Sequence, residues 1–357
     1  MVSLRPRITF KKGVCNACRN YKIYKKIDWK EKFSQLLKIA NQIKKENKNI
    51  KYNCIVPSGG GKDSSYVAWH VKNTLGLKPL CVFCEPPLFT KLGKRNLEKF
   101  EQSGFKVIKL KFNDHFRSYD RKAFVKMGLP QQAWLTAITI FPIKVAKKYG
   151  INYIFGGEEA ESLYGGSNKN FMRKLINIKD QYSSLLENQH LEEYFNKSKL
   201  NNFKNILLKK NDLNKFKSIN KIYWSNFEFW DEQKHFKIAQ EKCGMIIAKK
   251  KQTNSINKHS HLDQKLYALH MFIAYLKFGF SRATTDTSIA IRLGYMTRKK
   301  GLSMVNKYDN IFPSEFLKDY LKYFNLSKNE FFSVLKKHLN RKIFQNDNIF
   351  NLKLKKH

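Results

Sequence analysis

The 357-residue sequence is poor in cysteine, in acidic residues and in long apolar runs. Its six cysteines are too few and too scattered for a disulfide framework, so we expect a reducing compartment. The apolar stretches are interrupted by polar residues and fall short of a membrane-spanning length. Residues 1–14 carry basic side chains without a long apolar run, so we expect neither a signal peptide nor an anchor. These features predict a cytoplasmic protein without a membrane span.

Acidic residues are outnumbered by basic ones. The chain has 69 Lys and Arg against 28 Asp and Glu, which gives a formal net charge of +41 at pH 7. Such a field attracts nucleic acid, anionic lipid and phosphorylated small molecules. However, Lys and Asn are abundant along the whole chain, and no isolated basic arm stands out. We therefore attribute the charge to overall composition and do not expect nucleic acid as a partner.

Strands and helices alternate regularly in the first half of the chain. Apolar strands are predicted at residues 54–56, 79–84, 106–112 and 152–155, with helices at 64–75, 94–103, 119–127 and 132–149. This alternation predicts an α/β fold with a doubly wound parallel sheet, covered on both faces, that binds ligands at the carboxyl ends of its strands. The length allows about two domains, or one domain with a large insertion.

The sequence divides into five predicted segments. They are a short N-terminal extension at 1–50, the α/β domain at 51–170, a Lys- and Asn-rich insertion at 171–220, a helical segment at 221–310, and C-terminal helices with a basic tail at 311–357. Within the insertion region, residues 171–221 are predicted to form helices and loops. A helical block at 263–278 leads into a polar segment at 279–298, and two small amphipathic helices are predicted within 313–339.

The sharpest signal is a glycine-rich loop where the first strand meets a helix, at Gly59-Gly60-Gly61-Lys62-Asp63-Ser64-Ser65. Consecutive glycines let backbone N–H groups approach an anion closely, and the helix adds the positive end of its dipole. Lys62 supplies a charge, and the two serines supply hydroxyls. This is not the phosphate loop of kinases and GTPases, because Lys62 is followed by Asp63 and not by Ser or Thr.

A second glycine cluster, Gly156-Gly157, follows the strand at 152–155 and leads into Glu158 and Glu159. Because parallel strands end on one rim, these carboxylates are predicted to lie near the glycine-rich loop. There they could hold magnesium or a substrate, or they could form an exposed acidic turn.

A polar set follows the apolar helix at 263–278, and it consists of Arg282, Asp286, Arg292 and Arg298. Arginines suit a diphosphate because they offer paired donors in a planar fork. Ordinary surface ion pairs would use the same residues.

Two cysteine pairs have C-x-x-C spacing. Cys15 and Cys18 suit half of a tetrahedral zinc site, or they are a pair of free thiols. Cys81 and Cys84 lie in a predicted strand, where residues three apart point to opposite faces, so we interpret them as packing cysteines.

The glycine-rich loop resembles the pyrophosphate-loop signature Ser-Gly-Gly-X-Asp-Ser of ATP pyrophosphatases, which form adenylylated intermediates and release pyrophosphate. One position departs from this signature. Aligned without a gap, its first Ser falls on Gly59, whereas Ser58 lies one position earlier.

An ordered series of further motifs is similar to the N-acetyl sugar amidotransferases of lipopolysaccharide O-antigen and flagellar-glycan biosynthesis, the WbpG-like and PseA-like proteins. The matching stretches are residues 5–10, 13–18, 27–29, 54–66, 85–97, 156–158, 164–166, 230–231 and 277–298. The family usually carries another C-x-x-C upstream of the one at Cys15 and Cys18, and this sequence does not contain it.

The resemblance implies that ATP adenylylates the amide oxygen of an acetamido sugar and that ammonia then displaces AMP, leaving an acetamidino group. ATP is needed because an amide oxygen is a poor leaving group until it becomes a phosphate ester. Magnesium would neutralise the departing pyrophosphate. The implied site has catalytic residues Lys62, Asp63, Glu158, Arg282 and Asp286; ATP-binding residues Ser58, Gly59, Gly60, Gly61, Lys62, Asp63, Ser64 and Ser65; substrate-binding residues Gly157, Glu158, Glu159, Tyr164, Arg282, Arg292 and Arg298; and a partial zinc site at Cys15 and Cys18.

The resemblance also implies partners. The chain shows no glutaminase signature, and family members obtain ammonia from a separate glutaminase pair resembling the subunits of imidazole glycerol phosphate synthase. The sugar would be a nucleotide-linked diacetamido uronic acid or a nonulosonic acid such as pseudaminic or legionaminic acid.

Two other functions stay open. A tRNA-thiolating enzyme with a pyrophosphate loop would use ATP and would explain the basic charge and the cysteines, although no persulfide-carrying pair is visible on the predicted rim. A nucleotide-binding protein without catalysis would share the fold. The retention of Lys62, Asp63 and Ser64 argues against the latter.

Overall fold

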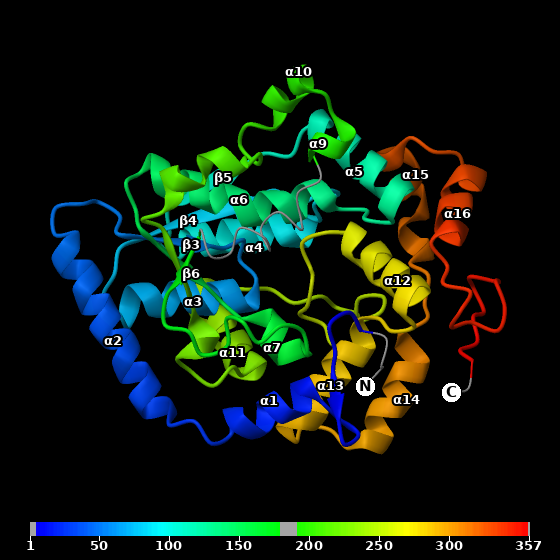
Figure 1. The fold of residues 1–357 in the computed structure, drawn as a ribbon, viewed down its shortest axis with the longest axis horizontal. Coiled ribbons are helices and arrows are strands. Elements are labelled where there is room, and N and C mark those ends of the chain that lie inside the picture. Colours follow the sequence, from blue (N-terminus) through cyan, green and yellow to red (C-terminus); the bar gives the residue numbers. More distant parts are fainter. Residues whose placement is uncertain (1–4, 179–190, 356–357) are drawn as a thin grey trace.

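The computed structural model describes residues 5–178 and 191–355 (Figure 1). At its centre lies a six-stranded sheet with the order β5-β4-β3-β6-β8-β7. The strands are β3 (Cys54–Pro57), β4 (Pro79–Cys84), β5 (Val107–Leu110), β6 (Tyr153–Gly156), β7 (Ile176–Asn177) and β8 (Asn220–Tyr223). All neighbouring pairs are parallel except β7 with β8. The predicted doubly wound α/β fold is confirmed.

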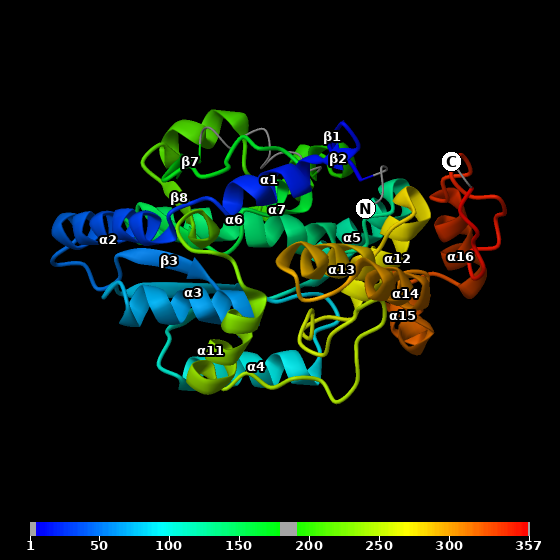
Figure 2. The same cartoon turned by 90° about the horizontal axis from the view of Figure 1, so that it is seen from below.

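Helices cover both faces of the sheet, as Figure 2 shows for α3 and α6 on either side of β3. One face packs against α2 (Trp29–Glu46), α3 (Lys62–Asn73), α4 (Lys91–Gln102) and α11 (Glu232–Cys243), and the other against α5 (Asp114–Met127) and α6 (Gln132–Lys148). Because both faces are covered, the central strands are continuously apolar. Cys81 and Cys84 are both buried and belong to different cores, as expected of packing cysteines.

The strand order indicates at which edge of the sheet a ligand would bind. From β3 the chain moves outward to β4 and β5, and it then returns to β6 on the other side of β3. Ligands of such sheets bind at this reversal, at the carboxyl ends of the two central strands. The glycine-rich loop follows β3 and the Gly156-Gly157 cluster follows β6, so both lie at the reversal.

The prediction of helices and loops for residues 171–221 was wrong at both ends of that segment. β8 pairs with β6 in parallel register, from Tyr153 with Asn220 to Gly156 with Tyr223, and β7 pairs with β8. The strand signal was weak because β8 has four residues and one of them is fully buried. Between the two strands the described residues form α9 (Leu191–Tyr194), α10 (Lys197–Leu200), η2 (Asn201–Phe203) and η3 (Lys210–Phe216).

A helical part with its own core follows the sheet. It contains α12 (Leu266–Phe278), α13 (Arg282–Leu293), α14 (Arg298–Tyr308), η5 (Ser314–Phe316), α15 (Leu317–Phe324) and α16 (Lys328–Lys337), whereas η4 (Trp224–Asn226), directly after β8, packs into the core of the sheet through Trp224. The two amphipathic helices predicted within 313–339 are α15 and α16. The polar segment at 279–298 contains α13, which was not predicted. Asp309 caps the N-terminus of that helix, because its carboxylate accepts hydrogen bonds from the backbone N–H groups of Ser281 and Thr284, at 2.8 and 3.0 Å.

The N-terminal segment packs beside the carboxyl end of β6. It forms β1 (Phe10–Lys11), β2 (Val14–Cys15) and α1 (Asn16–Tyr24), and α1 lies beside α7 (Ala160–Tyr164) in Figures 1 and 2. The Asn16 side-chain amide donates to the carbonyl groups of Gly165 and Gly166, at 2.8 and 3.1 Å. Among the helices of the described residues, none is long and apolar enough to cross a membrane. The five predicted segment boundaries stay predictions.

A buried carboxyl joins the sheet domain to the C-terminal helices. Asp120 of α5 accepts hydrogen bonds from the backbone N–H of Ala133 and from the Tyr323 hydroxyl, each at 2.6 Å. Burial raises the pKa of Asp120 to about 8, although both hydrogen bonds oppose this rise. The folded state therefore keeps a proton between about pH 4 and 8 that the unfolded state has released.

We expect Asp120 to make the protein less stable as the pH rises through this window. Its contribution to the free energy of unfolding should fall by up to about 1.4 kcal/mol per pH unit. Asp120→Asn keeps the shape and removes the titration. In chemical denaturation between pH 5 and 8, the free energy of unfolding of the variant should increase relative to that of the wild type as the pH rises. Parallel curves would contradict this interpretation.

Candidate active site

A cavity of about 360 Å³ opens at the carboxyl ends of β3 and β6. Its walls come from segments that are far apart in the sequence. They are residues 57–64, residues 82–84 at the end of β4, Glu158 and Tyr164 after β6, Glu232 at the start of α11, the loop at 259–263, and Arg282 of α13. The structure thus brings the glycine-rich loop, Glu158, Tyr164 and Arg282 to one cavity.

The glycines of the loop are required by close contacts. Gly60 has a positive φ of 79°, and a Cβ there would lie 2.5 Å from the carbonyl oxygen of Asn96. A Cβ at Gly59 would lie 2.8 Å from the ring of Phe83. A serine at position 59 would therefore collide with Phe83, which explains the departure from the pyrophosphate-loop signature. Ser58 carries the hydroxyl instead, and its Oγ donates to Ser64 Oγ at 3.1 Å.

The loop ends where α3 begins, with Gly61 as the N-terminal cap. The first helical hydrogen bond runs from Ser65 N–H to Gly61 O at 2.9 Å, so the N–H groups of the first turn have no intrahelical acceptor. These donors and the helix dipole are suited to binding an anion. Ser65 is fully buried behind the loop and does not line the cavity.

A buried cation directly follows the glycines of the loop and lines the cavity. Lys62 has a side chain that is 8 % exposed, and its Nζ forms ion pairs with Asp63 and with Glu232, the latter at 3.0 Å. Burial alone would lower the pKa of Lys62, but the carboxylates of Asp63 and Glu232 raise it above its ordinary value. Lys62 is therefore a permanent positive charge at neutral pH.

Asp63 is held on both sides. One carboxylate oxygen pairs with Lys62, and the other lies 2.9 Å from Nδ1 of His235, a buried side chain of α11. Burial would raise the pKa of Asp63, but Lys62 and His235 hold it below the ordinary range. Asp63 thus stays ionised and fixes the position of Lys62.

Glu158 behaves differently from Asp63. Its Oε2 accepts a hydrogen bond from the Tyr164 hydroxyl at 3.0 Å. Burial and the nearby carboxylates of Asp63 and Glu232 raise the pKa of Glu158 to about 7, against the opposing effect of Lys62 and Arg282. One carboxyl group of the cavity is therefore always charged, whereas another exchanges a proton near neutral pH. Such separation of pKa values is typical of acid–base sites.

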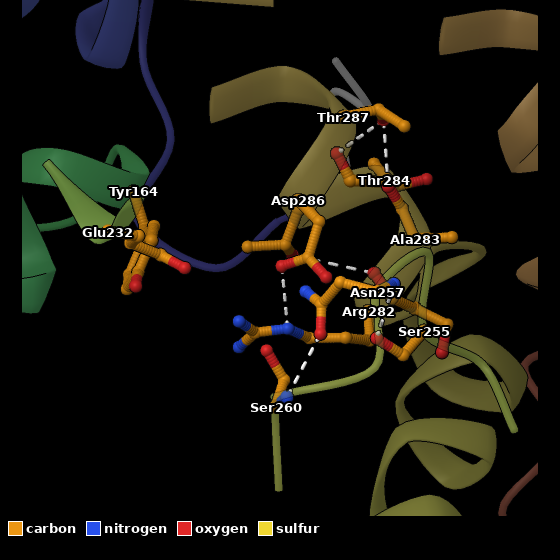
Figure 3. A network of polar contacts seen from close by, with 12 residues as sticks. Tyr164, Glu232, Ser255, Asn257, Ser260, Arg282, Ala283, Thr284, Asp286 and Thr287 are labelled. Atoms are coloured by element: carbon orange, nitrogen blue, oxygen red, sulfur yellow. Dashed lines mark hydrogen bonds and ion pairs between the residues drawn. The ribbon is translucent and has the colours of Figure 1, made fainter. Parts of the chain in front are cut away.

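Arg282 forms the wall that the C-terminal helices contribute. Its Nε forms an ion pair with Asp286 Oδ1 at 2.7 Å, one turn along α13, and Figure 3 shows the two side chains facing each other beside Ser260. One guanidinium nitrogen donates to the Tyr267 hydroxyl at 3.3 Å. Asp286 does not line the cavity; it orients Arg282. Burial raises the pKa of Asp286 to about 6, although Arg282 opposes this.

Other residues of the predicted site lie outside the cavity wall. Glu159 is buried, and its backbone N–H donates to Ser225 Oγ at 2.8 Å. Arg298 is exposed at the start of α14. Arg292 donates to the Leu163 carbonyl at 3.1 Å and lines a smaller neighbouring cavity. Gly157 is packed against Trp230, whose ring would lie 2.9 Å from a Cβ at that position.

Glu232 and His235 were missed from the sequence. Both lie in the first turn of α11, three residues apart, and this spacing places them on one face of the helix. Asp231 starts that helix by accepting a hydrogen bond from the Gln233 N–H at 3.0 Å. The Trp230-Asp231 motif was therefore the available signal, because it marks where the helix begins.

Cys15 and Cys18 do not make a zinc site by themselves. Cys15 is buried and Cys18 is half-buried, and burial raises the pKa of the Cys18 thiol, with a further rise from Cys15 beside it. Across residues 5–178 and 191–355, no group of three or more His, Cys, Asp or Glu side chains is arranged to hold a metal ion. The pair offers two ligands of the four that structural zinc requires.

Comparison with known proteins links the C-terminal part of the chain to a family. Residues 250–356 match the family model described as LPS biosynthesis protein WbpG-like, C-terminal domain. The comparison with curated proteins finds no match. Among solved structures, the chain is similar to U34-tRNA thiolase NcsA from Methanococcus maripaludis with its 4Fe-4S cluster. The identity is 10%, the match covers 87% of this chain and 79% of that chain, and the TM-score is 0.30, which is too low to carry an argument. The family match spans α12 to α16, so this C-terminal part of the chain is similar to the C-terminal domain of the WbpG-like LPS biosynthesis proteins.

Proposed function

We propose that the chain is an ATP-dependent amidotransferase of lipopolysaccharide or flagellar-glycan biosynthesis. It would adenylylate the acetamido oxygen of an activated sugar and replace that oxygen with ammonia to give an acetamidino group. The observation that carries the proposal is that one cavity is lined by the glycine-rich loop, by the buried ammonium of Lys62 and by Glu158, whose pKa burial raises to about 7. The WbpG-like match supports a sugar of surface-polysaccharide biosynthesis as the substrate.

The loop suits the leaving pyrophosphate. Ser58, Lys62 and Ser64 all line the cavity, and the first turn of α3, which begins at Lys62, offers N–H groups without an intrahelical acceptor. Charge builds on the pyrophosphate as the amide oxygen attacks the α-phosphorus. Donors fixed in advance in a site with little water stabilise such charge without reorganisation.

The second step needs a base. The lone pair of ammonia forms a bond to the adenylylated carbon, one nitrogen proton passes to the carboxylate of Glu158, and the carbon–oxygen bond breaks with its electrons leaving on AMP. Tyr164 orients Glu158 through the hydrogen bond at 3.0 Å. Arg282, fixed by Asp286, provides a charge for a phosphate of ATP or of the nucleotide sugar.

Magnesium stays a prediction. The described residues contain no group of side chains that could hold a metal ion on its own. A magnesium ion would therefore come with the phosphates of ATP, because Mg²⁺ commonly binds through one or two carboxylates together with substrate phosphates. It would neutralise the pyrophosphate. Zinc at Cys15 and Cys18, the glutaminase pair and the cytoplasmic location likewise stay predictions.

The tRNA-thiolating alternative needs a reactive cysteine in the cavity. Cys84 lines the cavity, but burial raises its pKa and so keeps the thiol protonated. The proposed amidotransferase reaction does not use the Cys84 side chain. A test of both is a Cys84→Ala variant, which should form the amidine as the wild type does.

We expect amidine formation to rise with pH as Glu158 loses its proton. The acting form is the carboxylate, so kcat/KM, calculated for free ammonia, should increase tenfold per pH unit below about pH 7 and level off above it. Glu158→Gln should remove this inflection and lower the rate by about 10²–10⁴-fold. Initial rates at six pH values between 5.5 and 8.5 would test this. An inflection that persists in Glu158→Gln would assign the titration to another group.

The proposed activity is tested by mixing the purified protein with ATP, Mg²⁺, ammonium and a panel of acetamido sugars. We expect AMP, pyrophosphate and a product whose mass differs from the substrate by replacement of one oxygen by an NH group. The panel should hold nucleotide-linked diacetamido uronic acids and the nonulosonic acids. Hydrolysis of ATP to ADP, or no sugar-dependent release of pyrophosphate, would contradict the proposal.

A further inference from the structure

A second cavity of about 40 Å³ lies beside the first. Side chains from α1, α7 and α13 line it together with Phe171, Trp230 and Glu232, and most of the lining is apolar, including Leu163, Phe171 and Ile289. Tyr164 and Glu232 line both cavities, so these two side chains form the partition between them. The smaller cavity therefore adjoins the carboxyl group of Glu158, which Tyr164 contacts.

The volume restricts what this cavity holds. A cavity needs about 10–15 Å³ to contain one water molecule, so the space fits one or a few molecules of that size. ATP and a sugar are excluded. Water and ammonia are the reactants and solvents of matching size, and ammonia is a substrate of the proposed reaction.

Two residues that line the cavity each carry a buried N–H donor without a partner among the described residues, and an occupant with a free lone pair would satisfy it. Trp230 is 7 % exposed, and its indole N–H has no hydrogen-bond partner in the described part of the chain. The same holds for one terminal nitrogen, Nη1, of Arg292. Both groups can only donate, and leaving a buried donor unpaired costs about 1–3 kcal/mol. An acceptor small enough to enter would satisfy them.

Ammonia and the ammonium ion differ in this respect. Ammonia has a lone pair that accepts a hydrogen bond, whereas ammonium has none. The carboxylate of Glu232, which also lines the cavity, is neutralised by Lys62 at 3.0 Å, so the guanidinium of Arg292 leaves the lining positive and repels a cation. The apolar lining also favours the neutral molecule.

We propose that the smaller cavity is the site where neutral ammonia waits before it attacks the adenylylated sugar. This inference rests on the proposed function. Ammonia held by the Trp230 indole N–H moves past Tyr164 and Glu232 into the larger cavity. There its nitrogen bonds to the adenylylated carbon, its proton passes to Glu158, and AMP leaves with the electrons of the broken carbon–oxygen bond.

The first test fills the cavity. Ile289→Trp adds bulk from α13, and Leu302→Trp, at a side chain of α14 that is 53 % exposed, is the matched control. We expect Ile289→Trp to raise the KM for ammonium at least tenfold. Exchange of labelled pyrophosphate into ATP, measured with sugar and without ammonium, should equal that of the control, because adenylylation does not use the smaller cavity.

The second test enlarges the cavity and looks for a gained activity. Leu163→Ala should let methylamine, which carries one extra carbon, replace ammonia and give an N-methylated amidine. The wild type should prefer ammonia strongly. Trp230→Phe should raise the KM for ammonium about 2–12-fold, the effect of losing one hydrogen bond.

The outcomes separate the two proposals. If the wild type shows neither sugar-dependent pyrophosphate exchange nor amidine, the proposed function fails. If the wild type is active but Ile289→Trp matches Leu302→Trp in its KM for ammonium, and Leu163→Ala gains no use of methylamine, the cavity holds only water and the ammonia site is overturned.

Discussion

Replacing Lys62 by Met is expected to lower kcat/KM for sugar-dependent pyrophosphate release by about 10²–10³-fold, the loss typical of removing one fixed donor from a developing oxyanion. Methionine retains the length and the apolar stem of lysine, so the change is mainly one of charge. The buried ammonium pairs with Asp63 and Glu232 and lines the cavity together with the glycine-rich loop. Its loss removes a positive charge from the proposed pyrophosphate site.

The same variant has a second readout. Lys62 lowers the pKa of Glu158, so Lys62→Met should move the inflection of the pH–rate profile above pH 7. Lys38→Met, at an exposed lysine of α2, is the control for a change of surface charge. A Lys62→Met enzyme with the activity of Lys38→Met would show that the loop does not stabilise the leaving group.

Replacing Gly60 by Ala is expected to raise the KM for ATP about 100-fold, because a displacement of the loop by as little as 1 Å costs about this factor. A Cβ at position 60 would lie 2.5 Å from the Asn96 carbonyl, which belongs to the backbone of α4 and cannot rotate away. The loop must therefore shift, and its N–H groups shift with it.

Gly150→Ala is the matched control for Gly60→Ala. Gly150 also has a positive φ, of 69°, but a Cβ there meets no atom within 4 Å. Both variants should lose about 1–2 kcal/mol of stability from the left-handed backbone. Gly60→Ala should also melt at a lower temperature because of its contact with Asn96, and it alone should lose affinity for ATP, measured by calorimetry on the folded proteins. Equal ATP affinities would show that the close approach to Asn96 does not set the shape of the loop.

Local sequence patterns were sufficient to locate four of the six strands of the sheet, β3 to β6, and the loop. The strand at 79–84 coincides with β4, and the glycine-rich loop lies between β3 and α3, because a buried parallel strand is continuously apolar and its turn is rich in glycine. β8 was missed because a short strand with one fully buried residue has no such signature. Its position in the sheet is set by pairing with β6, which is a tertiary effect.

The rest of the site depends on contacts between residues that are far apart in the sequence. His235 reaches Asp63 across 172 positions, so neither local pattern nor spacing could pair them. Two arginines show the opposite case, because they are close in the sequence but line different cavities. Arg282 and Arg292 lie at opposite ends of α13, about 15 Å apart along the axis, so one helix cannot present both to a single cavity. Arg282 and Arg292 were predicted to share one site because they are close in the sequence, but the length of α13 keeps them apart.

The most direct test of the account follows the oxygen atom that ATP is proposed to activate. A sugar substrate with ¹⁸O in its acetamido group is incubated with the protein, ATP, Mg²⁺ and ammonium, and the AMP is analysed by mass spectrometry. Adenylylation of the amide oxygen predicts that one ¹⁸O atom appears in the phosphate of each AMP, in step with formation of the amidine. Unlabelled AMP formed together with the amidine would contradict the account.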